Sequence, residues 1–436
     1  MSQSTQPAED TPGLPIRSLS VEVVDGEAKG ARAEGAAESL SVGSAEGNDL
    51  VIADPTVSRY HLELRRGEEG VRVIDHGSTN GTRYEGARIE RGTVPPGARL
   101  SLGHTTIRVD DGARITLELL EGDELAGLRG RTAVMRRLMA RVGKAARAEM
   151  PALLVGESGT GKERVARALH EESRRRSGPF VTVDCGALSP ALVASELFGH
   201  EKGAFTGAER QHVGAFERAH GGTLFLDEIG ELGAELQPAL LGVLERGRFR
   251  RVGGRKEVEA DVRVVAATHR DLRAEVNEGS FRLDLYYRLA VVVLELPPLR
   301  ARLEDVPLLV EHFLREAGHD GAVGEVFSAD AMTALCQHRW PGNVRELRNV
   351  VEATLAMGET PALHAADLPA EGDAALNDAL LTQPYKDARR LLLDAFERRY
   401  VQRLLERNDG NVSAAAREGR MDRTYLIKLK QRHELD

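Results

Sequence analysis

The feature that most constrains the fold is the stretch from Ala152 to Leu169, where an apolar run meets a glycine-rich turn and then a helical pattern. The turn has the spacing Gly-x-x-x-x-Gly-Lys, which predicts a phosphate-binding loop between a buried strand and a helix. Glycines let the backbone wrap around phosphate groups, and the loop N–H groups and the helix N-terminus attract anions. We therefore expect the phosphates of a nucleotide, ATP or GTP, to bind at Gly156, Glu157, Ser158, Gly159, Thr160, Gly161, Lys162 and Glu163.

One position departs from the usual form of this loop. Glu163 follows the lysine where a Ser or Thr normally binds Mg²⁺. Another motif must then supply the metal ligand. The apolar run from Thr223 ends in two carboxylates, and we expect Asp227 to bind Mg²⁺ and Glu228 to activate the attacking water. A further apolar run ends at Thr268, which either senses the nucleotide or is the polar end of an ordinary core strand.

Composition narrows the class of protein. The 436 residues suffice for two or three domains, and 29% charged with 41% hydrophobic residues is typical of a soluble globular chain. No apolar run approaches the ~20 residues of a membrane span. The two cysteines are far apart and lack metal-ligand spacing, so we expect a reduced cytoplasm. The net charge of −9 argues against generalised nucleic-acid binding.

The pattern along the chain predicts a multidomain protein. Short alternating strands, among them 106–109 and 115–119, predict a β-sandwich in the N-terminal part. Continuous apolar strands alternating with helices then predict a parallel sheet covered on both faces, followed by a helical lid. The expected segments are a disordered tail at 1–15, the sandwich at 16–120, a linker at 121–130, the α/β subdomain at 131–300, the lid at 301–368, a linker at 369–386 and a helical block at 387–436.

Two loop motifs of the sandwich, Ser58-Arg59-x-His61 and Gly77-Ser78-Thr79-Asn80-Gly81, resemble those of forkhead-associated (FHA) domains, which read phosphothreonine. The resemblance implies that Ser58, Arg59, Thr79 and Asn80 bind a phosphopeptide. The alternative is that these residues only stabilise turns. The resemblance is incomplete, because Ser44 stands where the family usually has a phosphate-pairing arginine.

The α/β part resembles the AAA+ ATPase domain of bacterial enhancer-binding proteins, the activators of sigma-54 RNA polymerase. The stretch from Glu196 carries the letters GAFTGA, the loop by which this family engages sigma-54. Small residues flank an aromatic and a threonine there, which favours a mobile tip with one apolar contact over a plain turn. The implied sigma-54 contacts are Gly203, Ala204, Phe205, Thr206, Gly207 and Ala208.

The same resemblance implies a homo-oligomer, a hexameric ring, with arginines that reach the neighbouring subunit's nucleotide. Arg282 and Arg288 are the candidates, and on one helix they would point about 120° apart. A solvated basic face is the alternative. Arg345 matches the lid arginine that senses nucleotide. Asp184 stands where the family often has an asparagine that restrains the catalytic glutamate.

The last block resembles the helix-turn-helix of enhancer-binding proteins. Residues 417–432 hold six basic and two acidic residues, a local charge of +4 against −9 overall. The alternative is a solvated helical hairpin. The candidates for the DNA major groove are Arg423, Thr424, Tyr425 and Lys428.

Together these features predict an all-β FHA sandwich, an α/β AAA+ P-loop ATPase with an α-helical lid, and an all-α helix-turn-helix. The resemblance implies a transcription activator of the bacterial cytoplasm. It would bind enhancer DNA and use ATP hydrolysis to remodel the closed sigma-54 promoter complex. Control would come through the FHA domain, from a phosphothreonine protein or a Ser/Thr kinase. The alternative is an FHA-regulated AAA+ remodeller of a client other than sigma-54.

Overall fold

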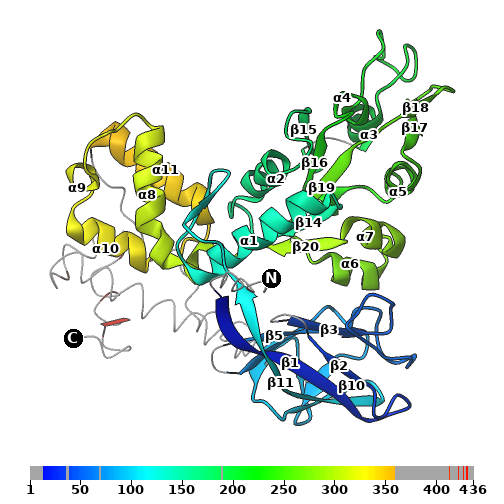
Figure 1. Cartoon of the computed structure of the whole chain (residues 1–436), viewed down its shortest axis with the longest axis vertical. Helices are drawn as coiled ribbons and strands as arrows, with labels where there is room; N and C mark the ends of the chain where they lie inside the picture. Colours follow the sequence, from blue (N-terminus) through cyan, green and yellow to red (C-terminus); the bar gives the residue numbers. More distant parts are fainter. Residues whose placement is uncertain are drawn as a thin grey trace, which may run out of the picture. The chain divides into compact units, whose positions relative to one another are not determined.

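Figure 1 shows the computed structural model, in which the chain divides into two units, Met1–Ala362 and Leu363–Asp436. The structure describes residues 13–35, 39–67, 70–187 and 190–358, together with the single positions Val412, Met421, Leu426, Leu429 and Lys430. Within this described part, no helix is both long and apolar enough to cross a lipid bilayer. The linker expected at 369–386 and most of the expected helix-turn-helix lie outside it.

The N-terminal region is a sandwich of two β-sheets, which confirms the expected fold. One sheet has the strand order β2-β1-β11-β10-β7-β8 and the other β4-β3-β5-β6-β9. Side chains alternate between the two faces of each sheet, so Leu62 and Leu64 lie in the core and Glu63 faces away from it. The strands are β1 Gly13–Asp25, β2 Arg32–Glu34, β3 Ser39–Gly43, β4 Leu50–Val51, β5 Leu62–Arg66, β6 Val71–Asp75, β7 Thr82–Tyr84, β8 Ala87–Ile89, β9 Arg91–Val94, β10 Arg99–Leu102 and β11 Thr105–Glu118.

Three details of the sandwich differ from the sequence expectation. The two strands expected at 106–109 and 115–119 are one strand, β11, because β1 pairs with it along its length with two register shifts. Strand β1 begins at Gly13, inside the segment assigned to the tail. The segment assigned to the linker contains a short hairpin, β12 Glu124–Leu125 and β13 Leu128–Arg129.

The middle of the chain forms a five-stranded parallel sheet in the order β15-β16-β19-β14-β20, as the apolar runs predict. Neighbouring residues of one strand enter different cores: Leu153 packs on one face and Leu154 on the other. Both faces are therefore covered, which explains why the strands are apolar without alternation. The strands are β14 Ala152–Val155, β15 Phe180–Asp184, β16 Thr223–Asp227, β19 Arg263–Thr268 and β20 Val292–Glu295.

Helices cover this sheet on its two faces (Figure 1). Helices α1 Ala133–Ala148 and α2 Lys162–Glu171 pack on the face that contains Leu154. The opposite face is covered by α3 Pro190–Phe198, α4 Ala215–Arg218, α5 Gln237–Arg246, α6 Leu272–Glu278 and α7 Leu283–Leu289. A hairpin, β17 Arg248–Arg250 with β18 Glu257–Glu259, follows α5.

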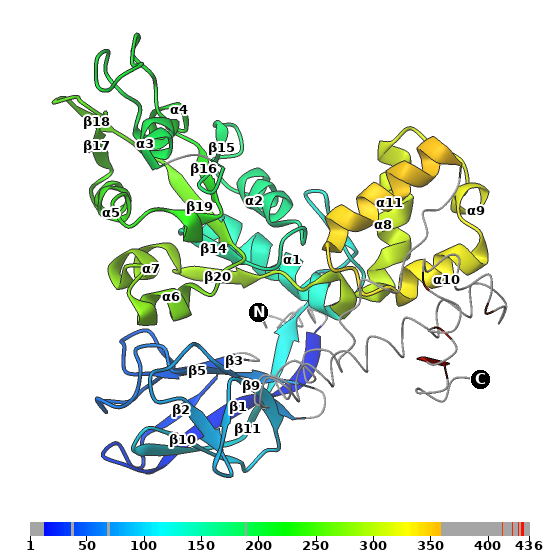
Figure 2. The ribbon, with the colours of Figure 1, turned by 180° about the vertical axis from the view of Figure 1, so that it is seen from behind.

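A helical lid follows the sheet, as expected (Figure 2). It consists of α8 Val306–Glu316, α9 Val323–Val326, α10 Ala329–Gln337 and α11 Asn343–Met357, preceded by the short 3-10 turns Leu299–Ala301 and Leu303–Asp305. Trp340 is fully buried between α10 and α11, and its indole N–H donates to the carbonyl oxygen of Leu335 at 3.0 Å. The lid packs beside the phosphate-binding loop through residues described below.

Candidate functional site: a nucleotide cavity and a projecting loop

The phosphate-binding loop joins β14 to α2 at the carboxyl end of the parallel sheet. Gly159 and Gly161 have φ angles of +78° and +103°, which favour glycine. A Cβ at Gly159 would lie only 2.3 Å from the carbonyl oxygen of Gly342, so the close approach of the lid also requires glycine. Lys162 is buried, and its ammonium donates to the carbonyl oxygen of Gly156 at 2.9 Å.

The two predicted acidic residues face the same cavity from the end of β16. A Glu228 carboxylate oxygen lies 3.7 Å from the Lys162 ammonium. Burial raises the pKa of Asp227, and the charge of Glu228 adds to this, while the backbone N–H of Glu228 acts in the opposite direction. Glu228 itself has φ 49° and ψ 49°, a left-handed conformation that is uncommon outside glycine and sets the direction of its side chain.

The side chain that contacts Glu228 lies directly after β19, and the sequence did not assign it this role. His269 Nδ1 lies 2.7 Å from Glu228 Oε2. Asp184 does not make this contact; its carboxylate accepts hydrogen bonds from the backbone N–H groups of Gly186 and Ala187 at 2.8 and 3.1 Å. The only sequence signal for His269 is its place directly after the apolar run that ends at Thr268.

A cavity of about 420 Å³ opens beside the loop and combines a polar end with an apolar end. The polar end holds the loop from Ser158 to Glu163 with Asp227 and Glu228. The apolar end is lined by side chains from the segment before α1, from α1 and from α8, among them Leu128, Met135, Leu138, Leu309 and Phe313. This arrangement suits a ligand with an anionic group at one end and a flat apolar group at the other.

The lid contacts the phosphate-binding loop directly. Arg345, predicted from the sequence, donates to the Ser158 hydroxyl oxygen at 3.0 Å. Asn343 donates to the Ser158 carbonyl oxygen at 3.0 Å and has a φ of 54°. Arg300 forms a two-pronged ion pair with Glu157 at 2.8 and 2.5 Å. Asn343 and Arg300 were not predicted, because neither belongs to a periodic pattern that marks a site.

A third unpredicted residue lies behind the loop. Arg302 is buried and donates to the carbonyl oxygen of Thr160 at 3.2 Å. Burial lowers the pKa of Arg302 to about 10. A buried guanidinium on a loop backbone helps to fix the shape of that loop, since a buried charge that lost its partners would be costly.

Two predicted residues contribute less directly to the cavity. Thr268 is fully buried. Its hydroxyl oxygen accepts a hydrogen bond from the backbone N–H of Arg270 at 3.0 Å, and its carbonyl oxygen accepts one from the backbone N–H of Gly156 at 3.2 Å. It therefore supports the loop from behind and does not line the cavity. Glu163 lines the cavity edge, and its carboxylate pairs with Arg167 one turn later at 2.8 Å.

The two candidate arginine fingers lie outside the cavity of their own chain and are exposed. The expectation that both lie on one helix is wrong. Arg282 precedes α7 with an extended backbone (φ −74°, ψ 134°) and pairs with Asp284 at 2.8 Å. Arg288 lies in the last turn of α7 and donates to the carbonyl oxygen of Leu244 at 2.9 Å. The 120° relation that a continuous helix would impose therefore does not hold.

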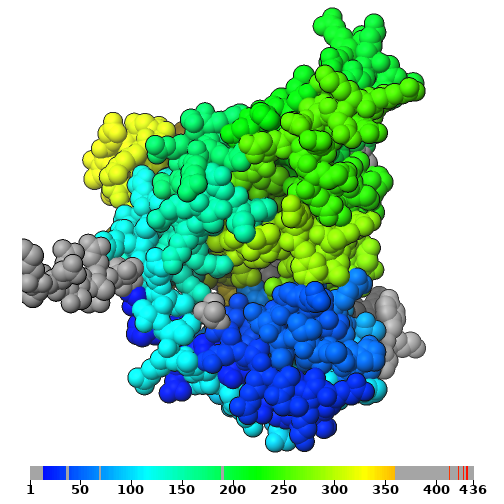
Figure 3. Space-filling model, turned by 45° about the vertical axis from the view of Figure 1, so that its right-hand side comes forward, coloured from blue at the N-terminus to red at the C-terminus, as the bar shows by residue number. Residues whose placement is uncertain are grey.

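The GAFTGA segment lies in the loop between α3 and α4, which projects from the sheet together with the β17–β18 hairpin (Figure 3). Gly203 and Gly207 have φ angles of +83° and +103°. The N–H of Gly203 donates to the carbonyl oxygen of Ala208 at 2.8 Å, and this hydrogen bond closes the tip of the loop. Phe205 is 40% exposed at this tip and touches His200 edge-on at 4.8 Å between ring centres. The loop thus presents one aromatic ring and one threonine to solvent.

The four candidate phosphopeptide residues come together at one end of the sandwich. The backbone N–H of Thr79 donates to the Ser58 hydroxyl oxygen at 3.0 Å, and the Asn80 amide donates to the Thr56 carbonyl oxygen at 2.8 Å. The N–H of Ser44 donates to the Ser58 carbonyl oxygen at 3.0 Å, so the loop that lacks the arginine adjoins them. The side chains of Arg59, Thr79 and Asn80 are exposed.

The four candidate DNA residues, Arg423, Thr424, Tyr425 and Lys428, lie outside the described residues. Among the five described positions of the C-terminal block 387–436, Leu426 and Leu429 are buried.

Comparison with known families agrees with these observations. Residues 128–295 match the family described as the sigma-54 interaction domain, and residues 300–380 match the AAA+ ATPase lid domain. Residues 22–112 match a family described as the cytoplasmic domain of an inner membrane component of the T3SS. The chain is 38% identical over 444 residues to the transcriptional regulatory protein GlrR of Escherichia coli (strain K12), covering 98% of this chain and 96% of that protein.

Two further relatives match part of the chain. The DNA-binding transcriptional regulator NtrC of Azospirillum brasilense is 52% identical over 237 residues, which are 54% of this chain and 49% of that protein. The crystal structure of NtrX from Brucella abortus is 38% identical, covers 70% of this chain and 69% of its own, and superposes with a TM-score of 0.51. The sigma-54 match, the lid match and the end-to-end similarity to GlrR lead to one conclusion: this chain belongs to the AAA+ family of sigma-54-dependent transcriptional activators.

Proposed function

We propose that the cavity binds ATP and that the chain hydrolyses it to remodel the closed sigma-54 promoter complex. One observation carries this proposal: the same domain contains a phosphate-binding loop with an acid pair and a projecting loop with the exposed Phe205. The polar end of the cavity suits the phosphates, and the apolar end suits the adenine base. A structure of NtrX from Brucella abortus in complex with ADP, with a TM-score of 0.50 and 37% identity, supports the nucleotide assignment.

The carboxyl groups fit a divalent cation that arrives with the nucleotide. Within the described part of the chain, no group of three or more His, Cys, Asp or Glu side chains could hold a metal ion unaided. Mg²⁺ would therefore be held by Asp227, by phosphate oxygens and by water, which is the usual arrangement for this ion. Bound there, it would neutralise phosphate charge, while Glu228 orients the attacking water and Lys162 holds the phosphates.

We propose that the active form is a ring of several copies, a hexamer by analogy with the family. Arg282 and Arg288 are exposed and lie away from the cavity of their own chain, so they suit contacts with the nucleotide of a neighbouring copy. An arginine supplied from a neighbour stabilises the charge that develops on the transferred phosphate. ATP hydrolysis would then depend on assembly.

The outer parts of the chain would supply location and control. The basic C-terminal block, with Arg423, Thr424, Tyr425 and Lys428, would bind enhancer DNA, since its local charge is positive while the chain is acidic overall. The sandwich would bind a phosphothreonine protein or a Ser/Thr kinase through Ser58, Arg59, Thr79 and Asn80, which offer clustered hydroxyl, guanidinium and amide donors. The chain would work in the bacterial cytoplasm, beside the polymerase.

The test compares two variants of the full-length protein. Glu228→Gln should bind ATP but hydrolyse it slowly, whereas Lys162→Ala should bind ATP poorly, because the first removes the group that orients water and the second removes a phosphate contact. Both should fail to open a sigma-54 promoter in a purified transcription system. Near-normal turnover by Glu228→Gln would refute the acid assignment. A wild-type protein that hydrolyses ATP yet binds neither sigma-54 nor DNA would favour the alternative, a remodeller of another client.

A further inference from the structure

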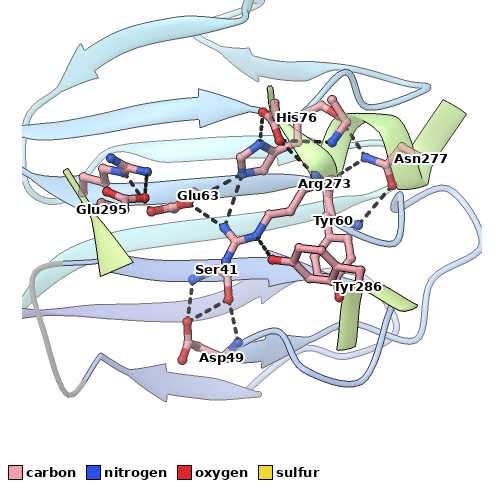
Figure 4. Close-up of polar contacts among 12 residues, drawn as sticks. Ser41, Asp49, Tyr60, Glu63, His76, Arg273, Asn277, Tyr286 and Glu295 are labelled. Carbon is pink, nitrogen blue, oxygen red and sulfur yellow. Dashed lines mark hydrogen bonds and ion pairs between the residues drawn. The ribbon is translucent and has the colours of Figure 1, made fainter. Parts of the chain in front are cut away.

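The sandwich uses its recognition loops to contact the ATPase domain of the same chain. Figure 4 shows Tyr60, the residue after Arg59, reaching out of the sandwich between α6 and α7. Tyr60 is only 2% exposed, belongs to the core of the ATPase domain, and lies edge-on to Tyr286 at 5.2 Å between ring centres. A sandwich residue inside another domain's core marks a specific contact.

Paired charges surround this aromatic anchor. Arg273 of α6 forms an ion pair with Glu63 of the sandwich at 2.5 Å and donates to the Tyr286 hydroxyl at 3.1 Å. His76 contacts Asp271, which caps α6, at 2.6 Å. Glu63 and His76 are nearly buried, and each has a charged or polar partner from the ATPase domain. Buried charges are tolerated only when they are paired in this way.

Asn277 of α6 joins two recognition loops of the sandwich. Its side-chain oxygen accepts from the N–H of Tyr60 at 3.2 Å, and its side-chain nitrogen donates to the carbonyl oxygens of Tyr60 and His76 at 2.7 and 2.9 Å. Tyr60 directly follows Arg59, and His76 precedes Thr79 and Asn80 by three and four positions. The residues held by Asn277 are thus close neighbours of the donor cluster.

The third loop of the cluster is held by α7. The Tyr287 hydroxyl donates to the carbonyl oxygen of Glu46 at 2.9 Å. A Cβ at Gly47 would lie only 2.5 Å from the Tyr287 ring, so the ring lies directly on this loop. The loop begins at Ser44, whose backbone bonds to Ser58. A peptide laid across the donor cluster along this loop would meet Tyr287.

We propose that phosphopeptide binding and docking of the sandwich onto α6 and α7 exclude each other. Both use the loops that contain Ser44–Gly47, Ser58–Tyr60 and His76–Asn80. A bound phosphopeptide would release the sandwich from α7. Arg282 directly precedes this helix and Arg288 lies in its last turn, so undocking would remove the sandwich from the helix that carries both candidate arginine fingers. This inference rests on the proposed phosphothreonine binding and adds how binding reaches the ATPase.

The test titrates full-length protein with a labelled degenerate peptide pool that carries one fixed phosphothreonine, by fluorescence anisotropy. Asn277→Ala removes three hydrogen bonds of the docked form and none within the sandwich. In the docked form Arg59, Thr79 and Asn80 are exposed, but Tyr287 lies on the adjoining Ser44–Gly47 loop, so only the undocked form would hold the whole peptide. When the binding-competent form is a minor population, the apparent affinity falls with that population. We therefore expect Asn277→Ala to bind the pool on the order of tenfold more tightly than wild type. Tyr287→Phe, which removes one hydrogen bond and keeps the ring, should give a smaller gain, about threefold.

Two controls and a second measurement make the outcome decisive. Glu278→Ala changes the exposed neighbour of Asn277 and should leave the affinity unchanged. Asn80→Ala should abolish binding in both backgrounds. Hydrogen exchange should show the Tyr60 amide exchanging faster in Asn277→Ala, and in wild type with saturating peptide. Equal affinity of wild type and Asn277→Ala, with faster exchange in the variant, would overturn the exclusion alone. Failure of both to bind any phosphopeptide, with the same faster exchange, would overturn the phosphothreonine proposal and the exclusion together.

Discussion

Replacing His269 tests whether the contact at the end of β19 positions the catalytic acid. His269 Nδ1 lies 2.7 Å from Glu228 Oε2, whereas the Asp184 carboxylate accepts a hydrogen bond from the backbone N–H of Gly186. His269→Ala would remove this contact and leave the Lys162 ammonium, 3.7 Å from the Glu228 carboxylate, as the nearby cation. The carboxylate would then sample more orientations, and fewer of them would hold the attacking water correctly.

The size of the effect follows from the bond and its exposure. A hydrogen bond to a charged group contributes about 1.5–3 kcal/mol when well shielded. The His269 side chain is 45% exposed, so solvent reduces this toward the ~1 kcal/mol of an accessible pair. Since 1.36 kcal/mol corresponds to a factor of ten in rate, we expect kcat for ATP hydrolysis to fall about five- to tenfold. The KM for ATP should change little, because in the proposed mechanism Glu228 orients water while Lys162 holds the phosphates.

Steady-state ATP hydrolysis by the full-length protein gives both constants. His269→Asn should recover part of the rate, since an amide can still donate to the carboxylate. In a Glu228→Gln background, His269→Ala should cost little more, because the two residues act as one unit. An unchanged kcat for His269→Ala, or a double variant whose losses multiply, would refute the positioning role.

Four other predictions follow from the same structure. Thr206→Ala should keep ATPase activity within about twofold but lose open-complex formation, because the loop tip lies away from the cavity; full activation in a purified sigma-54 system would contradict this. A chain truncated before Tyr385 should keep ATPase activity but lose DNA binding in a gel-shift assay, and binding by the intact chain should weaken steeply with salt. Ser44→Arg should tighten phosphothreonine binding about tenfold to a hundredfold, since it restores one charge-assisted hydrogen bond of about 1.5–3 kcal/mol; unchanged titrations would show that the missing arginine is irrelevant. Burial lowers the pKa of His76, but hydrogen bonds to Asp271 and Glu63 outweigh it and raise the pKa above 6.5, with the Arg273 charge acting against them. The docked sandwich should therefore be most stable below about pH 6.5 and lose this contribution as pH rises through the raised pKa, as thermal unfolding and exchange of the Tyr60 amide would report; the profile of His76→Gln should be flatter.

The sequence by itself determined the elements whose physics is local. The glycine-rich loop lies between a strand and a helix because Ala152–Val155 is apolar and Gly161-Lys162 starts a helical pattern at once. The five strands of the parallel sheet follow from continuous apolar runs, and Asp227 and Glu228 end one of them. A continuous apolar run indicates a strand that is buried on both faces. The sheet and the acid pair at the end of one strand could therefore be predicted from the sequence alone.

Local patterns failed where a partner lies far along the chain. The strand alternation of β5 alone would place Glu63 in water, yet it is 6% exposed because Arg273, 210 positions later, covers and pairs with it. Arg282 has a helical neighbourhood in sequence, but its amide donates to Gln237 at 2.9 Å and its backbone is extended. No periodicity encodes such contacts.

The completed site was likewise decided by the tertiary structure. His269 meets Glu228 across 41 positions. Asn343 of the lid and Arg300 of the turn before it reach the phosphate-binding loop across more than 140 positions. Each is an unremarkable polar residue in its own segment. Sequence reveals the groups that perform chemistry because they need a fixed local frame, the strand end and the glycine loop. The residues that hold them in place are chosen by packing between distant segments, and only the folded chain identifies them.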